Sequence, residues 1–400
     1  MLQDPRRRAL IQILLVLLTA VTLLMSGAEL RTGQSALAQL DLAGWLAGLP
    51  YALALFSFIT VHEFGHFLTA RYHRVRTTWP FYLPLYLPGF FNIGTLGAVI
   101  MLREQPWSTR KYFDIGIAGP LAGFVVSIGL LIYGFSHLPD PDAYILELHP
   151  EYVEQFGGVP DVDTMRAFQA EEGFPSLWIG TNLLYEFFAR VIPADPGRVP
   201  PPFEMMHYPF LFTGFLTLFF TALNLLPVGQ LDGGHVIYGM FGRQRAGVVA
   251  RITLGVLLLV GGTGLVDWQQ PGPSTIFAWL LYLPLLYYVS KPVLRLHRTQ
   301  DRLLAVLGFC VLQGLLKLGF PAWNPQGLWL IYSLMLVRVV KLDHPPAYYE
   351  ARVSPSRQAL GWLAILIFVL SITPAPLTLE GMPPADWRAE WQELLGWLWG

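Results

Sequence analysis

Apolar residues in this chain are grouped into runs long enough to cross a lipid bilayer. A transmembrane helix needs about 20 mostly apolar residues, and nine stretches approach this length, although the eighth is short. They are residues 9–27, 48–70, 113–135, 209–228, 247–266, 276–294, 303–320, 327–340 and 358–373. The pattern predicts an all-α polytopic membrane protein with about nine transmembrane helices.

One apolar stretch, residues 77–103, does not have the pattern of a helix. Prolines stand at positions 80, 84 and 88, and a proline inside a helix interrupts it. The following IGTLGAVIML, residues 93–102, suits a β-strand. Apolar backbone outside a helix must be sheltered by protein or line a cavity. We therefore expect a small membrane-embedded β hairpin or re-entrant segment here.

The long polar connection, residues 136–208, is acidic and interrupted by prolines. No regular strand pattern is visible in it. TMRAFQAEEGF and SLWIGTNLLYEFFARVI have the composition of short amphipathic helices at a membrane surface. A further interfacial helix is predicted in the tail, where tryptophans and leucines follow helical spacing.

Basic residues indicate how the chain is oriented. Those at the N-terminus and in four connections fall on one side of the membrane if the spans alternate, and the positive-inside rule makes that side cytoplasmic. The N-terminus then faces the cytoplasm, and the connection 136–208 and the C-terminus lie outside. The first apolar run, of about 19 residues, is longer than a usual signal peptide core, so we favour an uncleaved helix. The expected location is a prokaryotic cell (inner) membrane.

Composition agrees with a membrane protein and excludes some functions. The chain is 54% hydrophobic and only 13% charged, whereas soluble domains carry about 25% charged residues. The formal net charge is −1, which gives no basis for nucleic-acid binding. The single cysteine, Cys310, cannot form a disulfide within the chain.

The second apolar run contains the sequence HEFGH, with His62, Glu63 and His66. Positions i and i+4 lie on one face of a helix, so two imidazoles can hold one Zn²⁺ ion and the glutamate can act as general base. The alternative is a pair of buried histidines that are satisfied by hydrogen bonds. Ionisable residues are costly inside a membrane and usually mark a functional site, which favours the metal.

Zinc requires a third protein ligand and an open position for water. The candidate is Asp232, in NLLPVGQLDGGH at the end of the fourth span. The second and fourth spans end on the same side, so the two segments can meet at one depth. The sequence DGG alone is a weak turn signal. It indicates a metal ligand only in combination with the HEFGH motif.

HEFGH followed by NLLPVGQLDGGH resembles the site-2 protease family of intramembrane zinc metalloproteases, in the branch without an evident PDZ domain. That family has HExxH and N-x-x-P-x-x-x-L-D-G, and the second motif is matched at Asn224, Pro227, Leu231, Asp232 and Gly233. The resemblance covers roughly residues 50–245. It implies that His62, His66 and Asp232 bind Zn²⁺, that Glu63 activates the water, and that Asn224 holds the substrate backbone or the oxyanion.

The resemblance also suggests a division of the chain. Residues 1–46 form an N-terminal helix and external loop, and residues 47–245 form the catalytic core with the acidic loop 136–208. Additional helices occupy residues 246–375, and residues 376–400 form the interfacial tail. The expected partners are transmembrane protein substrates and the lipid bilayer.

Several residues keep more than one interpretation. Asn224 could instead make a hydrogen bond between helices, and His235 could be a supporting residue, an extra ligand or an interfacial side chain. His73 is expected to be solvated, and His207 lies on the far side from the motif. The glycines of GIAGPLAGF predict close helix packing that holds the zinc helix in place.

A substrate helix must unwind before its peptide bonds can be attacked. The segment IGTLGAVIML could receive the unwound chain as an added strand, or it could be an ordinary re-entrant hairpin. Two functions other than proteolysis remain open: a catalytically inactive scaffold of the same fold, and a metal transporter, which would need further carboxylates or histidines within its spans.

Overall fold

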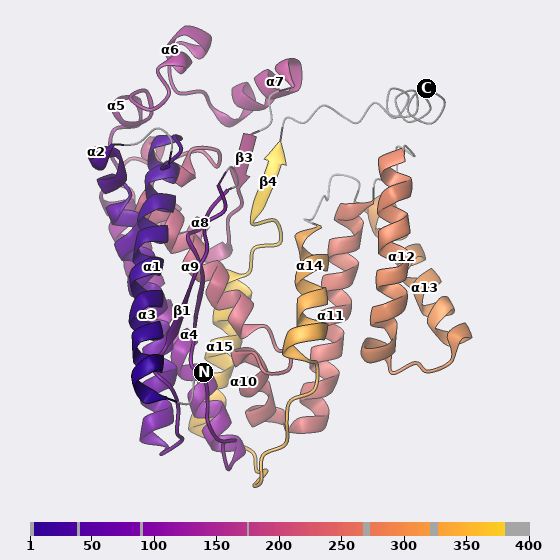
Figure 1. Cartoon of the computed structure of the whole chain (residues 1–400). Coiled ribbons are helices and arrows are strands. Elements are labelled where there is room, and N and C mark those ends of the chain that lie inside the picture. Colours follow the sequence, from indigo (N-terminus) through magenta and orange to yellow (C-terminus); the bar gives the residue numbers. More distant parts are fainter. Residues whose placement is uncertain are drawn as a thin grey trace.

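The computed structural model of the chain describes residues 4–37, 41–88, 91–173, 176–266, 273–320 and 327–380. Long helices run roughly side by side, and a layer of short helices covers one end of them (Figure 1). The predicted interfacial helix in residues 381–400 lies outside the described residues.

Six helices in the described residues are long and apolar enough to cross a membrane. They are α1 (Pro5–Thr32), α3 (Leu49–Tyr72), α4 (Thr109–Ser136), α11 (Arg243–Leu265), α12 (Pro273–Leu294) and α13 (Thr299–Gly319). Three shorter apolar helices occupy the other predicted spans. They are α9 (Pro209–Leu225), α14 (Leu328–Met335) with its π-helical continuation η3 (Leu336–Val340), and α15 (Pro355–Ser371). The prediction of an integral, mostly helical membrane protein is confirmed, whereas the count of nine spans is not.

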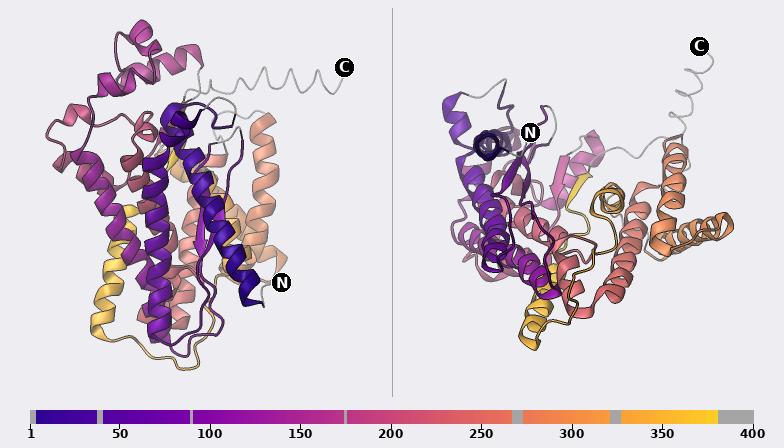
Figure 2. Two further views of the ribbon diagram at one scale, coloured as in Figure 1. Left: turned by 60° about the vertical axis from the view of Figure 1, so that its left-hand side comes forward. Right: turned by 60° about the horizontal axis from the view of Figure 1, so that its bottom comes forward.

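The apolar segment rich in proline forms the expected hairpin. Strand β1 (Phe81–Pro84) pairs with β2 (Thr95–Val99) in an antiparallel sheet of two strands. The hairpin runs along α1 (Figure 2, left). Gly94, just before β2, has a φ of 91°, which residues with a side chain rarely adopt. A two-stranded sheet leaves one edge of β2 without a strand partner in the described part of the chain.

The connection 136–208 forms the layer at the end of the bundle. It contains α5 (Pro141–Ile145), α6 (Glu151–Phe156), α7 (Val162–Glu172), β3 (Ser176–Ile179), α8 (Leu183–Val191) and the 3-10 turns η1 (Pro196–Arg198) and η2 (Met205–His207). The first predicted helix is present as α7. Of the second, residues 176–192, only the later part is helical, as α8, and its first residues form β3, where no regular strand pattern was visible. Strand β3 pairs with β4 (Leu377–Glu380), about 200 residues later, and a partner so distant is not visible in the local pattern.

Two separate apolar cores divide the bundle. One core lies among α1, α3, α4, α9 and the extramembrane layer, and includes Tyr51, Leu131 and Phe212. The other lies among α9, α11, α12 and α14, and includes Leu254 and Tyr282. Helices α12 and α13 stand at the side of the molecule away from α1 and α3 (Figure 2, right).

An ion-pair cluster joins three helices at the end opposite the extramembrane layer. His73 Nε2 lies 2.9 Å from Asp114 Oδ2, and Arg357 donates to both oxygens of the same carboxylate at 2.6 and 2.9 Å. Only 9% of the His73 side chain is exposed. The expectation that His73 is solvated was therefore wrong, because no local pattern indicates that Asp114, 41 positions later, contacts it.

Candidate metal centre

Helix α3 carries both histidines of HEFGH on the face that packs against α4. His62 and His66 are buried, with 4% and 7% of their surfaces exposed. The predicted glycine packing is present, because a Cβ on Gly119 would overlap His66 Nε2, and one on Gly123 would press on His62 and Phe58. Small residues let two helices approach closely, so the glycines of α4 make room for the two imidazoles.

Asp232 reaches the histidines because the chain breaks between two helices. Helix α9 ends at Leu225, two residues before Pro227, and α10 (Asp232–Phe241) begins at Asp232. Gly233 and Gly234 lie so close to the backbone carbonyls of Leu225 and Gly229 that a Cβ at either position would overlap them. The tight turn holds the first residue of α10 against α3.

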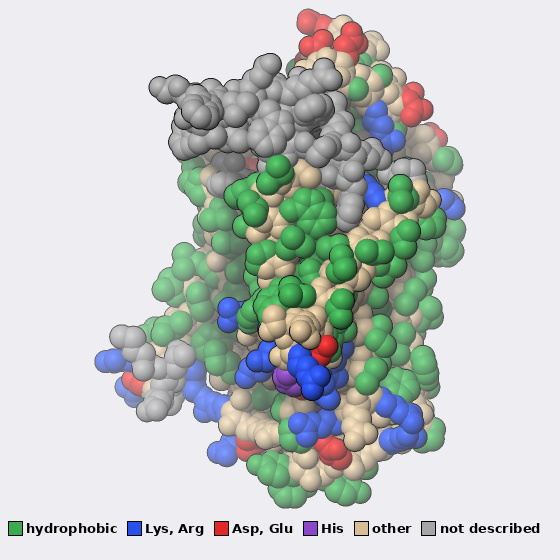
Figure 3. Space-filling view, turned by 90° about the vertical axis from the view of Figure 1, so that its right-hand side faces the viewer, with side chains coloured by type: hydrophobic (Ala, Val, Ile, Leu, Met, Phe, Trp, Pro, Cys, Tyr) green, Lys and Arg blue, Asp and Glu red, His purple; other side chains and the backbone are tan. Residues whose placement is uncertain are grey.

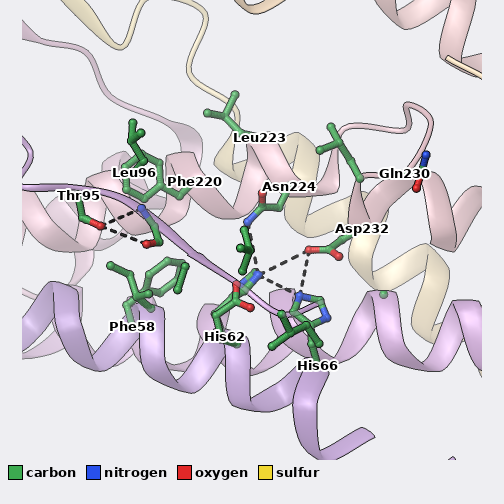
Figure 4. Close-up of a pocket in the computed structure, with 18 of the residues that line it drawn as sticks. Phe58, His62, His66, Thr95, Leu96, Phe220, Leu223, Asn224, Gln230 and Asp232 are labelled. Atoms are coloured by element: carbon green, nitrogen blue, oxygen red, sulfur yellow. Dashed lines mark hydrogen bonds and ion pairs between the residues drawn. The ribbon is translucent and has the colours of Figure 1, made fainter. Parts of the chain in front are cut away.

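The three side chains converge on one point (Figure 4). His62 Nε2 lies 3.1 Å from His66 Nε2, and Asp232 Oδ2 lies 3.6 Å from the first and 3.3 Å from the second. Ligands at about 2.0–2.2 Å from a tetrahedral Zn²⁺ are about 3.3 Å from one another. The donor atoms therefore have the spacing that one zinc ion requires.

The hydrogen bonds of the imidazoles agree with metal binding through Nε2. His66 Nδ1 lies 2.7 Å from the Ile115 carbonyl oxygen. A carbonyl only accepts, so Nδ1 carries the hydrogen and Nε2 of the neutral ring keeps its lone pair. Metal-bound histidines are commonly oriented by such a bond.

Glu63 and Asn224 lie beside this point. Asn224 Nδ2 is 3.4 Å from His62 Nε2, and Glu63, which is 7% exposed, faces the backbone of Ile100 just after β2. Both residues line a cavity of about 610 Å³ together with the three metal-binding candidates and residues 95–100. The structure thus brings together all five residues that the motifs singled out.

His344 is a further residue near this site, and no pattern in the sequence pointed to it. His235 lines the same cavity, and its Nδ1 lies 2.6 Å from Nε2 of His344, which is only 4% exposed. Burial and the neighbouring His235 lower the pKa of His344 to about 3. The two residues are 109 positions apart, so no motif could have paired them. The pair fastens α10 to the segment before α15.

Comparisons with known proteins point in the same direction. The family model of peptidase family M50 matches residues 50–262. The probable zinc metalloprotease EGY1, chloroplastic, of Oryza sativa subsp. japonica is 29% identical over 198 residues, which are 50% of this chain and 29% of that protein. The Arabidopsis thaliana protein of the same name is 26% identical over 225 residues, 56% of this chain and 35% of its own length. The chain therefore spans about a third of these curated relatives. No solved structure matches it significantly.

Proposed function

The chain belongs to peptidase family M50, and on that premise we propose that it is an intramembrane zinc metalloprotease. It would hydrolyse peptide bonds in or near the transmembrane segments of membrane proteins. The observation that carries this proposal is the convergence of His62, His66 and Asp232, from two separate helices, beside Glu63. The resemblance to the site-2 protease family, first noted from the two motifs, agrees with the family match.

His62, His66 and Asp232 would hold the Zn²⁺ ion, which when bound lowers the pKa of its water to near 7 and polarises the scissile carbonyl. Glu63 takes the proton from the attacking water and passes it to the leaving amine. Burial of Glu63 keeps bulk water away from this transfer. The amide N–H of Asn224 is placed to donate to the oxyanion that develops on the substrate.

Substrate would reach the site along β2. Residues 95–100 line the cavity, and β2 has a strand partner on only one side in the described residues. An extended peptide can add to an open sheet edge through its backbone hydrogen bonds. A locally unwound substrate segment placed there would present its peptide bonds to Glu63, which faces Ile100.

The two alternative functions have less support. An inactive scaffold usually lacks a ligand or the base, and here all three ligands and Glu63 lie together. A metal transporter needs further carboxylates or histidines along a path through the membrane. Helix α9, which runs from the extramembrane layer to the metal centre, carries no charged residue.

We propose that the metal centre lies toward the cytoplasmic side, with the N-terminus on that side. Lys and Arg side chains gather at the lower end of the face in Figure 3, and a group of Asp and Glu side chains lies at the upper end. The positive-inside rule favours this orientation. A prokaryotic inner membrane stays a prediction, since the relatives named above are chloroplastic.

The proposal is tested with purified chain in detergent or lipid and a model transmembrane substrate with helix-weakening residues. We expect the wild type to cleave it and Glu63→Gln to lose about 10²–10⁴-fold in rate while it keeps its zinc. Cleavage by Glu63→Gln at the wild-type rate would refute the proposed mechanism.

A further inference from the structure

A second group of two histidines and one carboxylate lies in the extramembrane layer. His149 stands in the turn before α6, Glu204 directly precedes η2, and His207 is the last residue of η2, which leads into α9. His149 Nε2 lies 3.3 Å from His207 Nε2, and Glu204 Oε2 is 3.8 and 3.7 Å from these two nitrogens. Three potential ligand atoms therefore face one another at nearly the spacing of a tetrahedral site, about 3.3 Å.

This group has too few N–H hydrogens for each of its facing nitrogen and oxygen atoms to take part in a hydrogen bond. His149 Nδ1 lies 2.9 Å from Glu151 Oε1, and a carboxylate only accepts, so the hydrogen of the neutral ring is on Nδ1. Its Nε2 then carries a lone pair, and a neutral His207 has one N–H at most. When both rings are neutral and Glu204 is ionised, the three facing atoms of His149, Glu204 and His207 share no more than one hydrogen.

One oxygen of the Glu204 carboxylate is buried without a hydrogen bond to the described part of the chain. The residue is 1% exposed, and its Oε2 has no hydrogen-bond partner among the described residues. Leaving a buried charged oxygen without a partner is costly. A cation between Oε2 and the two imidazoles would remove that cost.

Neighbouring residues hold the ligand atoms in place. Tyr152 donates its hydroxyl hydrogen to Glu204 Oε1 at 2.8 Å, which leaves Oε2 for a metal. The Tyr152 ring also stacks on His149, with 4.8 Å between centroids and an angle of 15°. The contact of His149 with Glu151 has the form of the carboxylate–histidine pairs that orient metal ligands.

We propose that His149, Glu204 and His207 bind a second divalent transition-metal ion, with Zn²⁺ preferred. Two imidazoles and one carboxylate are ligands that zinc accepts, and Mg²⁺ or Ca²⁺ would require mainly oxygen ligands. An adjoining cavity of about 490 Å³, lined also by Gly33 and Gln155, leaves room for water as the fourth ligand.

This ion would join two parts of the extramembrane layer: the part that contains α5 and α6, and η2, which leads into α9. Glu204 and His207 directly precede α9, while His149 belongs to the part of the layer that contains α5 and α6. The same junction carries a hydrogen bond from the Tyr144 hydroxyl to the His207 carbonyl oxygen, 2.8 Å, and Arg31 of α1 lies over the Tyr144 ring at 4.1 Å. The metal would add to these contacts between α5, α6 and η2.

The test uses the full chain with the first site disabled by His62→Ala/His66→Ala. The metal-free protein is loaded with Co²⁺, whose visible absorption reports its coordination, and separately with Zn²⁺, which is counted by mass spectrometry. Further variants carry His149→Gln or Glu204→Gln. The matched control is His137→Gln, which changes an exposed histidine at the same end of the molecule.

We expect the disabled background to bind one ion of either metal with a tetrahedral Co²⁺ spectrum, and the control to match it. His149→Gln and Glu204→Gln should each lose that ion. Circular dichroism is used to check that every variant is folded. A folded background that binds no ion would overturn the proposal, and so would an ion retained in both ligand variants. Neither result depends on proteolytic activity, so failure here leaves the proposed function intact.

Discussion

The two clusters of two histidines and one carboxylate lie near opposite ends of α9, and they are built differently. In the first, His62 and His66 sit on one rigid helix and glycines of α4 press against them. In the second, His149 and Glu204 come from turns and are positioned by Tyr152 and Glu151. Packing against backbone fixes the first cluster, whereas hydrogen bonds to side chains fix the second. The first should therefore be very sensitive to added volume and the second to lost polar groups.

The largest effect is expected when volume is added beside the first cluster. In Gly119→Ala the new methyl group would overlap His66 Nε2, the atom that faces the metal. A misplacement of about 1 Å can cost about 100-fold in rate, so we expect at least that loss together with reduced zinc content. Gly129→Ala on the same helix is the control, because a Cβ there meets no atom within 4 Å. Equal activity in the two variants would show that α4 does not position His66.

The next effect concerns the open edge of β2. Ile100 faces Glu63, and backbone directions alternate along a strand, so the N–H of Ala98 should point to the same open side. Ala98→Pro removes this donor, and we expect about a tenfold loss of cleavage, the worth of one good hydrogen bond. Ala98→Val keeps the N–H and should cleave normally. Proline at Gly94 or Gly97 would be a poorer test, since their φ values of 91° and 95° exclude it. Normal cleavage by Ala98→Pro would argue against strand addition.

A smaller effect is expected from the second cluster. With the first site disabled, adding Zn²⁺ at about 100 times its dissociation constant should raise the unfolding midpoint by about 4 °C. With the first site disabled, Glu204→Gln should show no such rise, whereas His137→Gln should behave as its parent. Thermal unfolding followed by circular dichroism measures both. The same rise in Glu204→Gln would mean that zinc stabilises the chain elsewhere.

The smallest effect concerns the pH dependence of stability and His344, which contacts His235 of α10. The pKa of His344 is lowered to about 3, while an unfolded histidine titrates near 6.5, so the unfolded chain binds the proton first as pH falls. The free energy of unfolding should therefore decrease below about pH 6.5, with His344 contributing about 1 kcal/mol per pH unit. His344→Gln should weaken this dependence, which unfolding at pH 7 and pH 5 measures. An unchanged pH dependence would show that His344 is accessible to protons in the folded chain.

The difference between the clusters also explains what could be predicted from the sequence. His62 and His66 are four positions apart, and helical periodicity alone places them on one face. Asp232 was found because a proline and two glycines mark a break in an apolar run. His149 is 55 positions before Glu204, in a loop without periodicity, so its partners were visible only in three dimensions.

In the fold as well, features that depend on neighbouring residues were predicted and features that depend on distant residues were not. Apolar runs predicted the positions of the long helices, and three prolines predicted the hairpin. The predicted spans at α9, α14 and α15 contain helices that are shorter than a membrane span requires. An apolar run does not reveal where the helix inside it ends. Strand β3 and the buried contact of His73 depend on partners about 200 and 40 residues away, which local patterns cannot contain.

The most direct test of the account is the zinc content of His66→Ala, Asp232→Ala and the double variant, each folded and loaded with Zn²⁺ after the metal has been removed. We predict that both single variants and the double variant lose the same one ion relative to the wild type, because α3 and α10 hold it together. If Asp232→Ala kept the full wild-type zinc content, or if the double variant lost one ion more than either single variant, these residues would not share a metal.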